Sequence, residues 1–321
     1  MQVLHFKPEQ LPAPIEPGEA IKQSEGFFWL DLERNEDDWQ HKARSWLEGI
    51  RLHERHTRDI LNETHPPFYD GTEDYDLLVM RSLCPHCPPE SPTTHPVAFI
   101  VAGDCVISIR PPSDPVFDGL RHRLMSNLRK PPASPAVLLY LLLNQITDTL
   151  LSGRDAISEL LSGWQERLLD REDQFDDWQA LMRLRGQLRR LEVVVESQLD
   201  ALDEWRVQTV LPLDRSLAVR YNDLEEHLRR VYNHAALVQN DIDALIQVYF
   251  SANTQRTNDT LQFLTILSAV FLPLNLLAGL FGMNFKHMPW LGSLYGPWIL
   301  LGSMALIVIG LLVWFRHNRW L

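Results

Sequence analysis

The stretch LQFLTILSAVFLPLNLLAGLFGMN, residues 261–284, decides the fold of this 321-residue chain. Its first 21 residues, Leu261 to Phe281, carry no formal charge. At about 1.5 Å of rise per residue, a helix of that length covers roughly the 30 Å hydrocarbon thickness of a bilayer. The stretch therefore predicts a transmembrane helix over residues 261–283.

A second uncharged stretch follows soon after the first. Residues 287–315 carry no formal charge, and residues 294–315 are long enough to cross a bilayer again. Residues 284–293 are too few for a domain, so we expect a short external loop between two membrane helices. A buried hairpin in a soluble protein is the alternative, but two spans of about 18 or more apolar residues seldom occur in a globular core.

The basic end of the chain indicates its orientation in the membrane. Residues 316–321 read RHNRWL, and segments rich in Lys and Arg tend to stay in the cytoplasm. The first 30 residues contain no continuous apolar core of the kind that a signal peptide needs. We therefore expect a multi-pass protein of the cell inner (plasma) membrane, embedded in the lipid bilayer, with the N-terminus and the basic tail both cytoplasmic.

Charge and cysteine content restrict the function classes. The net charge is −12 and the pI is about 5.4, whereas binding to nucleic acid needs basic patches, so nucleic acid is excluded as a partner. The three cysteines are too few and too unevenly spaced to predict a disulfide framework. No nucleophile stands beside a suitable base and no phosphate-binding loop occurs, so we expect neither an enzyme nor a cofactor.

The region that precedes the membrane begins with a mixed domain. Residues 1–133 combine strand-like runs, helical patterns and proline-rich loops, which predicts a cytoplasmic α/β domain. The strand-like runs are Gln2–Phe6, Phe27–Glu33, Tyr75–Leu83 and Val97–Ile109, and the helical patterns are Asp37–His53 and Val116–Arg129.

Helical sequence then continues to the membrane. Residues 134–212 have few helix breakers and a turn near Asp170–Asp173, which predicts an antiparallel helical hairpin. Residues 213–260 contain no proline and no glycine, and they predict a very long stalk helix that continues into the first membrane helix. The expected fold class is therefore an α+β membrane protein.

The polar residues of the first span share one face. At 100° per residue from Asn258, the polar and small residues fall in a sector about 100° wide; they are Thr265, Ser268, Asn275 and Gly279. Leu261 and Leu272 fall in the same sector, and the face continues backward through Thr254, Gln247, Asp243 and Asn240. Polar side chains are costly in lipid, so this face is expected to point to a cavity or to another helix.

Two explanations of this polar face stay open at this point. Small and polar residues also mediate contacts between packed membrane helices. Two spans per chain cannot enclose a channel, but a ring of identical chains can, because each chain presents the same helix to a central axis. In such a ring the face becomes a water-lined path that two leucine rings interrupt.

Several motifs make the chain resemble the CorA family of divalent-cation transporters. They are Tyr249-Phe250-Ser251-Ala252-Asn253 with Arg256-Thr257-Asn258, the run Phe271-Leu272-Pro273-Leu274, the signature Phe281-Gly282-Met283-Asn284-Phe285 with Met288-Pro289, and the ending Trp320-Leu321. The resemblance implies a funnel-shaped homopentamer in which the long stalk helix lines the pore. It also implies transport of Mg²⁺, Co²⁺ or Ni²⁺, with a ZntB-like branch that moves Zn²⁺.

The resemblance further implies roles for particular residues. The mouth that first meets the hydrated ion is expected at Gly282, Met283 and Asn284. Pore-lining positions are Asn258, Asn275 and Gly279, to which the polar face adds Thr265, Ser268, Gln247 and Thr254, and the hydrophobic gate is Leu261, Leu264 and Leu272. Mg²⁺ sheds its water reluctantly, so neutral oxygens that hydrogen-bond to its water shell can pass the hydrated ion.

The loop after the signature departs from the pattern of magnesium transporters. It carries Lys286, His287 and Trp290 where such relatives often have acidic residues, which is closer to the zinc branch. His287 is a candidate metal ligand there, with simple solvation as the alternative. Gln247 stands where an aspartate often sits, and the regulatory acidic site of the family has no clear position in this chain.

A second candidate metal site lies in the N-terminal domain. Cys84-Pro85-His86-Cys87, with His95 nearby, has the spacing of a zinc site. No second CxxC or His pair accompanies it, so a proline-rich connector between strands is the alternative. Cys84 and Cys87 are the candidate ligands.

The leading hypothesis is a homopentameric, potential-driven transporter of divalent cations, Mg²⁺ first, in which the ion is cargo and no cofactor is needed. A ZntB-like Zn²⁺ transporter, with proton coupling left open, is the close alternative. A membrane-anchored cytoplasmic sensor or scaffold is the distant one, because a simple anchor has no need of an aligned polar face.

Overall fold

The computed structural model describes residues 2–8, 10–15, 25–36, 38–47, 49–126, 131–169, 177–283 and 295–318. The chain divides into two compact units, Met1–Ile246 and Gln247–Leu321. The boundary between the units falls inside a 68-residue helix, α6 (Arg215–Gly282).

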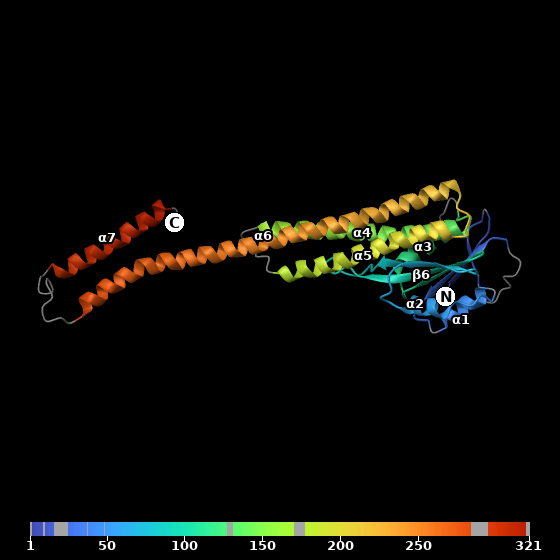
Figure 1. Cartoon of the computed structure of the whole chain (residues 1–321), viewed down its shortest axis with the longest axis horizontal. Coiled ribbons are helices and arrows are strands. Elements are labelled where there is room, and N and C mark those ends of the chain that lie inside the picture. Colours follow the sequence, from blue (N-terminus) through green and yellow to red (C-terminus); the bar gives the residue numbers. More distant parts are fainter. Residues whose placement is uncertain are drawn as a thin grey trace. The chain divides into compact units, whose positions relative to one another are not determined.

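The first unit contains a mixed sheet of seven described strands (Figure 1). The strand order is β2-β1-β3-β7-β6-β5-β4, and every neighbouring pair is antiparallel except β3 and β7. The strands are β1 (Gln2–Phe6), β2 (Ala13–Pro14), β3 (Phe27–Glu33), β4 (Phe68–Gly71), β5 (Asp76–Leu83), β6 (Thr94–Ala102) and β7 (Cys105–Arg110). The expected mixture of helices and strands in the N-terminal region is therefore present.

Both faces of this sheet are buried because helices cover each of them. Along β5, Leu77 and Val79 belong to one apolar cluster while Leu78 and Met80 belong to the other, as the two-residue period of a strand requires. Figure 1 shows α1 (Trp39–Trp46) and α2 (Glu54–Leu61) on one side of the sheet, and α3 (Pro115–Ser126) with the long helices on the other. Burial on both faces explains why these strands read as continuous apolar runs.

Two expectations for this unit are wrong in detail. The run Val97–Ile109 is the hairpin β6–β7 rather than one strand, because Gly103 takes a positive φ of 53° and turns the chain. The helical pattern from Asp37 stops at α1, since Gly49 has a φ of 94°, and a separate helix, α2, follows. The hydrophobic pattern of α2 is weak because only His56 and Ile60 are buried.

Three long helices complete the first unit: α4 (Pro135–Leu169), α5 (Trp178–Gln208) and the first part of α6. Long helices are what the sequence predicts for residues 134–260, and the expected turn near Asp170–Asp173 lies outside the described residues. In α6 the buried residues recur at steps of four and three, as along a coiled-coil seam; they include Leu217, Tyr221, Leu224, Leu228, Val231, Ala235, Val238, Ile242 and Leu245. Most of this seam shares one apolar cluster with buried residues of α4 and α5.

Three described helices are long and apolar enough to cross a membrane. In α4, 44% of the most apolar window is buried, because that helix contributes its apolar side chains to the core of the first unit. The corresponding windows of α6 and of α7 (Gly296–His317) are only 0% and 6% buried. The two helices with uncovered apolar windows thus contain the two uncharged stretches of the sequence. The expected loop at residues 284–293 lies outside the described residues.

Candidate ion-conducting face of α6

One side of α6 faces α7 within the second unit. Along the uncharged part of α6, partly buried residues recur at steps of about three or four; they are Gln262, Ile266, Ala269, Val270, Pro273, Leu274, Leu277 and Phe281. Leu277 and Phe281 border an apolar cavity of about 420 Å³ together with Ile299 and Leu300 of α7. At 100° per residue from Asn258, these eight partly buried positions centre near about 90°.

The polar face lies on the other side of the helix. All of its members from Asn258 onward are exposed, and so is the expected gate residue Leu264 at the edge of the face; the members are Asn258, Leu261, Thr265, Ser268, Leu272, Asn275 and Gly279. Their directions centre near about 300°, roughly 150° from the side that faces α7. Leu272 is 76% exposed, so even a large apolar side chain on this face has little cover. If helix packing is the reason for this face, the packing partner is a second chain.

Threonine hydroxyls on this face present acceptors outward. Thr265 Oγ1 donates to the Leu261 carbonyl at 2.7 Å, and Thr254 Oγ1 donates to the Phe250 carbonyl at 2.8 Å. Because each hydroxyl proton is used inside the helix, the oxygen keeps only lone pairs for other partners. The water molecules around a hydrated cation are hydrogen-bond donors, so these oxygens suit them.

The face carries no formal charge between Gln247 and Met283. Arg256 and Asp259 are the charged residues of that segment, and they point near about 160° and 100°, away from the face. Asp259 accepts a hydrogen bond from Gln255 at 2.8 Å. A divalent ion that moved along the face would meet neutral oxygens, which bind its water shell without the strong hold of a carboxylate.

Asp243 does not extend the free polar face, contrary to the sequence expectation. Its carboxylate pairs with Arg185 of α5, with 2.7 Å between Nε and Oδ1. The two residues are 58 positions apart, so their contact is invisible to a count along α6. Gln247, Thr254 and Asn240 are exposed.

Thr257 belongs to the face but escaped the sequence reasoning. It is exposed, and it points near about 260°, inside the same sector. Its hydroxyl donates to the Asn253 carbonyl at 3.0 Å, the arrangement found at Thr265. The backward count along the helix passed over this position, although its angle falls at the edge of the sector.

The Gly-Met-Asn signature begins at the C-terminal end of α6. Gly282 is the last helical residue, and Met283 is 51% exposed. Asn284 and His287 lie outside the described residues, so their roles stay predictions. A Cβ added at Gly279 or Gly282 would meet no atom within 4 Å. No contact inside the described chain therefore requires a glycine at either position.

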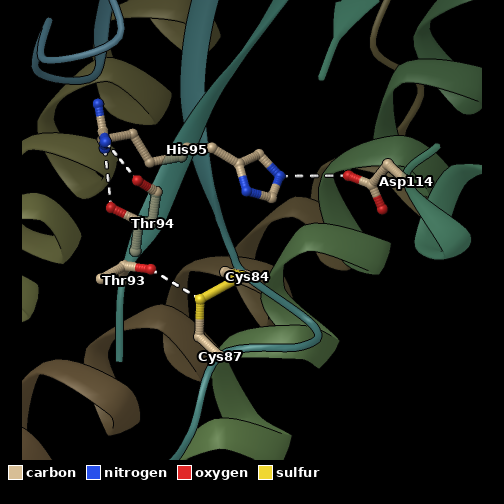
Figure 2. The surroundings of a disulfide bond; sticks show 7 residues. Cys84, Cys87, Thr93, Thr94, His95 and Asp114 are labelled. Atoms are coloured by element: carbon tan, nitrogen blue, oxygen red, sulfur yellow. Dashed lines mark hydrogen bonds and ion pairs between the residues drawn. A yellow bond between two sulfur atoms is a disulfide. The ribbon is translucent and has the colours of Figure 1, made fainter. Parts of the chain in front are cut away.

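The candidate metal ligands Cys84 and Cys87 form a disulfide (Figure 2). The sequence reasoning missed this bond, which closes a local turn after β5 rather than a framework. In this form neither sulfur is a thiolate that could bind zinc. Figure 2 shows that His95 points to Asp114, with 3.2 Å between Nε2 and Oδ2.

No group of three or more His, Cys, Asp or Glu side chains in the described part of the chain could hold a metal ion. A zinc site at Cys84 and Cys87 therefore stays a prediction for the reduced chain. The third cysteine, Cys105, is buried, and burial raises the pKa of its thiol to about 12. Such a thiol is inert rather than reactive at neutral pH.

Comparison with known sequences finds transport proteins along almost the whole chain. The family described as CorA-like Mg²⁺ transporter protein matches residues 24–317. The cobalt/magnesium transport protein CorA of Thermotoga maritima is 24% identical over 277 residues, which cover 85% of this chain and 78% of that protein. The zinc transport protein ZntB of Vibrio parahaemolyticus is 24% identical over 297 residues, which cover 91% and 88%.

The fold also matches a solved structure, the CorA magnesium transporter from Methanocaldococcus jannaschii. The TM-score is 0.82 at 18% identity, and the match covers 100% of this chain and 99% of the other. At that level of identity the likeness shows the fold alone.

Proposed function

This chain belongs to the family of CorA-like Mg²⁺ transporter proteins, and from that premise we propose that five copies of it conduct divalent cations, Mg²⁺ first, through a shared central pore. Transport of divalent metal ions follows from the family. The preferred ion, the number of copies and the path through the membrane are the parts that we propose. The observation that carries them is the polar, uncharged face of α6 that α7 leaves exposed.

A ring of five chains would turn each residue of the face into a ring of five side chains. Asn258 and Asn275 would supply amide oxygens, and Thr265 would supply hydroxyl oxygens, to the water shell of the ion. Leu261 and Leu272 would form apolar constrictions that can close the path by excluding water. The exposure of these leucines in the single chain is consistent with such a role.

The membrane potential is a sufficient driving force for this proposal. An inside-negative potential of 100 mV gives a divalent ion about 4.6 kcal/mol on moving inward, twice the value for a single charge. Movement without nucleotide hydrolysis is therefore feasible.

The membrane placement is part of the proposal. The C-terminal half of α6 and α7 would cross the inner membrane, since their apolar windows are almost uncovered. The basic residues after α7, such as Arg316, favour a cytoplasmic C-terminus. With two crossings, the N-terminus would lie on the same side.

A Zn²⁺ transporter is the second candidate. The similarity to ZntB from Vibrio parahaemolyticus favours it. The segment after the signature also contains Lys286 and His287 but no carboxylate before α7, and imidazole is a better ligand for Zn²⁺ than for Mg²⁺.

Uptake into proteoliposomes tests the proposal. Mg²⁺, Zn²⁺, Co²⁺ and Ni²⁺ are compared with and without a membrane potential and a pH gradient. We expect Mg²⁺ uptake that follows the potential and that falls about tenfold or more in Asn284→Ala, because a hydrogen bond to a charged ligand is lost in every subunit. Ser303→Ala on α7, whose hydroxyl donates to the Leu300 carbonyl at 2.8 Å, is the matched control.

Each other result has its own meaning. Zn²⁺ uptake that exceeds Mg²⁺ uptake and follows the pH gradient selects the second candidate. Undiminished uptake in Asn284→Ala removes that residue from the mouth. Cations that bind but never move would indicate a membrane-anchored sensor or scaffold.

A further inference from the structure

A cavity of about 650 Å³ opens in the first unit between α5, β5 and the segments that precede β4 and β6. Its lining includes three arginines, Arg81 on β5 and Arg189 and Arg190 on α5, and no described lining residue is acidic. We call this the arginine cavity. A volume of a few hundred Å³ or more is typical of pockets for small molecules.

Arg81 is a buried cation that neutral groups hold in place. Only 8% of its surface is exposed. Its guanidinium donates to Thr94 Oγ1 at 2.8 Å and to the carbonyls of Glu63 at 2.8 Å, of His65 at 3.0 Å and of Thr94. Within the described ranges no carboxylate forms an ion pair with it. These bonds use four of the five guanidinium N–H groups, so Arg81 contributes positive charge to the cavity rather than free donors.

A second guanidinium adds to the positive charge behind Arg81. Burial lowers the pKa of Arg34, and the charge of Arg81 lowers it further. The Arg34 Nε is buried and has no hydrogen-bond partner among the described residues. Burial also lowers the pKa of Arg81, and the Glu63 carboxylate raises the pKa of both arginines. Two cations therefore share one nearby carboxylate.

Arg189 and Arg190 differ from the other arginines of α5. Arg183 pairs with Asp177, Arg185 pairs with Asp243, and Arg206 pairs with Glu225. Arg189 and Arg190 are exposed at the arginine cavity, and neither forms an ion pair with any residue in the described part of the chain. Both guanidiniums are therefore available to a ligand in the cavity.

We propose that the arginine cavity binds a phosphorylated small molecule of the nucleotide class. Guanidinium groups bind phosphate oxygens through paired N–H donors, and the exposed side chains of Arg189 and Arg190 at the cavity supply such donors. Val193 and Val194 provide an apolar wall against which an uncharged group such as a nucleobase can pack. Neither the family membership nor the ion path assigns a ligand to this place.

Calorimetric titration of the purified full-length chain tests this proposal independently of ion movement. Divalent cations are omitted so that cargo binding does not contribute. The ligands are pyrophosphate, ADP and adenosine. We expect pyrophosphate and ADP to bind, ADP more tightly, with an affinity that falls as salt rises. Adenosine alone should bind much more weakly than ADP.

The double variant Arg189→Gln/Arg190→Gln should bind ADP at least about tenfold more weakly, since each lost charged hydrogen bond costs a factor of that order. Both side chains are exposed, so the fold should be retained. Arg183→Gln is the matched control, because Arg183 is an exposed arginine of the same helix whose partner is Asp177. Its affinity for ADP should equal that of the wild type.

Three results would overturn the proposal. The first is no binding of pyrophosphate or ADP to the wild-type chain at millimolar concentration. The second is equal affinity in the wild type and the double variant. The third is a pair of results: the wild-type chain binds no anion, and the double variant no longer forms oligomers. Together they would show that carboxylates of a neighbouring chain fill the cavity. Equal affinity for pyrophosphate and ADP would keep the phosphate site and overturn only the nucleoside part.

Discussion

At the residue scale, the glycines of α6 show whether the space for a side chain is limited by the chain itself or by neighbouring chains. Gly279 lies in the polar face, and a Cβ there would meet no atom within 4 Å. The described chain thus has room for a larger side chain at this position. If the face lines a pore, five added side chains would instead narrow the path near its outer end.

Gly279→Val should therefore reduce ion uptake several-fold while the chain still folds and assembles. Gly310→Val on α7 is the matched control, because a Cβ at Gly310 likewise meets no atom within 4 Å. The comparison is made by proteoliposome uptake, with thermal unfolding measured in parallel. Uptake that is equal in the two variants would place Gly279 away from the ion path.

Single residues also mark the limit of what the sequence could predict about the site. The angular count along α6 placed Thr265, Ser268 and Asn275 on one face because helix geometry depends only on spacing. It failed at Asp243, whose partner Arg185 comes from another helix. It also had no means to foresee that Cys84 and Cys87 are joined while His95 contacts Asp114. Contacts between distant segments are set by the tertiary fold.

At the element scale, α6 changes its pattern along its length. Up to Leu245 its buried residues follow a coiled-coil spacing that packs against α4 and α5. Beyond that point the buried seam is replaced by a partly buried side toward α7 and an exposed polar face. The long helix was predictable because residues 213–260 contain no proline or glycine. The helix α2 was not, because only two of its residues are buried.

The contact between α4 and α6 predicts a pH dependence of stability. His234 of α6 lies 2.9 Å from Ser158 of α4, measured between Nε2 and Oγ. Burial lowers the pKa of His234, and the charge of Arg154 lowers it further, while Asp155 and Asp241 oppose the shift. The folded chain thus favours the neutral imidazole. Its contribution to stability is present above the ordinary pKa of 6.5 and is lost as the pH falls below it.

Thermal unfolding at pH 7.5 and pH 5.5 checks this dependence. Acidification should lower the Tm of the wild-type chain more than the Tm of His234→Asn, which keeps a polar side chain without a titrating ring. His122→Asn replaces an exposed histidine and serves as the control. The same drop in Tm for the wild type and His234→Asn would contradict the assignment.

At the scale of the whole molecule, two long helices with uncovered apolar windows were predictable from length and charge alone, since few other structures require such uncharged stretches. The apolar runs that form the strands were predictable from the sequence. The division of the run Val97–Ile109 into two strands was not, because it depends on the positive φ of Gly103. The number of chains in the assembly has no signature in one sequence apart from the resemblance to a family.

A pentamer is the assembly that the proposal requires. Native mass spectrometry of the detergent-solubilised protein should give five times the 37.2 kDa mass of the chain. The polar face of α6 is needed at a central axis only in such a ring. The measurement is repeated over the range of detergent concentrations in which the protein stays active in transport. If only monomers or dimers appear throughout that range, the proposal is contradicted.

Thiol accessibility on adjacent residues of α6 tests the central claim most directly. Thr265→Cys and Ile266→Cys are compared in a chain whose native cysteines are replaced, because these neighbours point about 100° apart, the first on the polar face and the second toward α7. A charged thiol reagent added during uptake should block most of the remaining flux in Thr265→Cys and leave Ile266→Cys unchanged. Block of both variants alike, or of Ile266→Cys alone, would show that the polar face of α6 does not line the ion path.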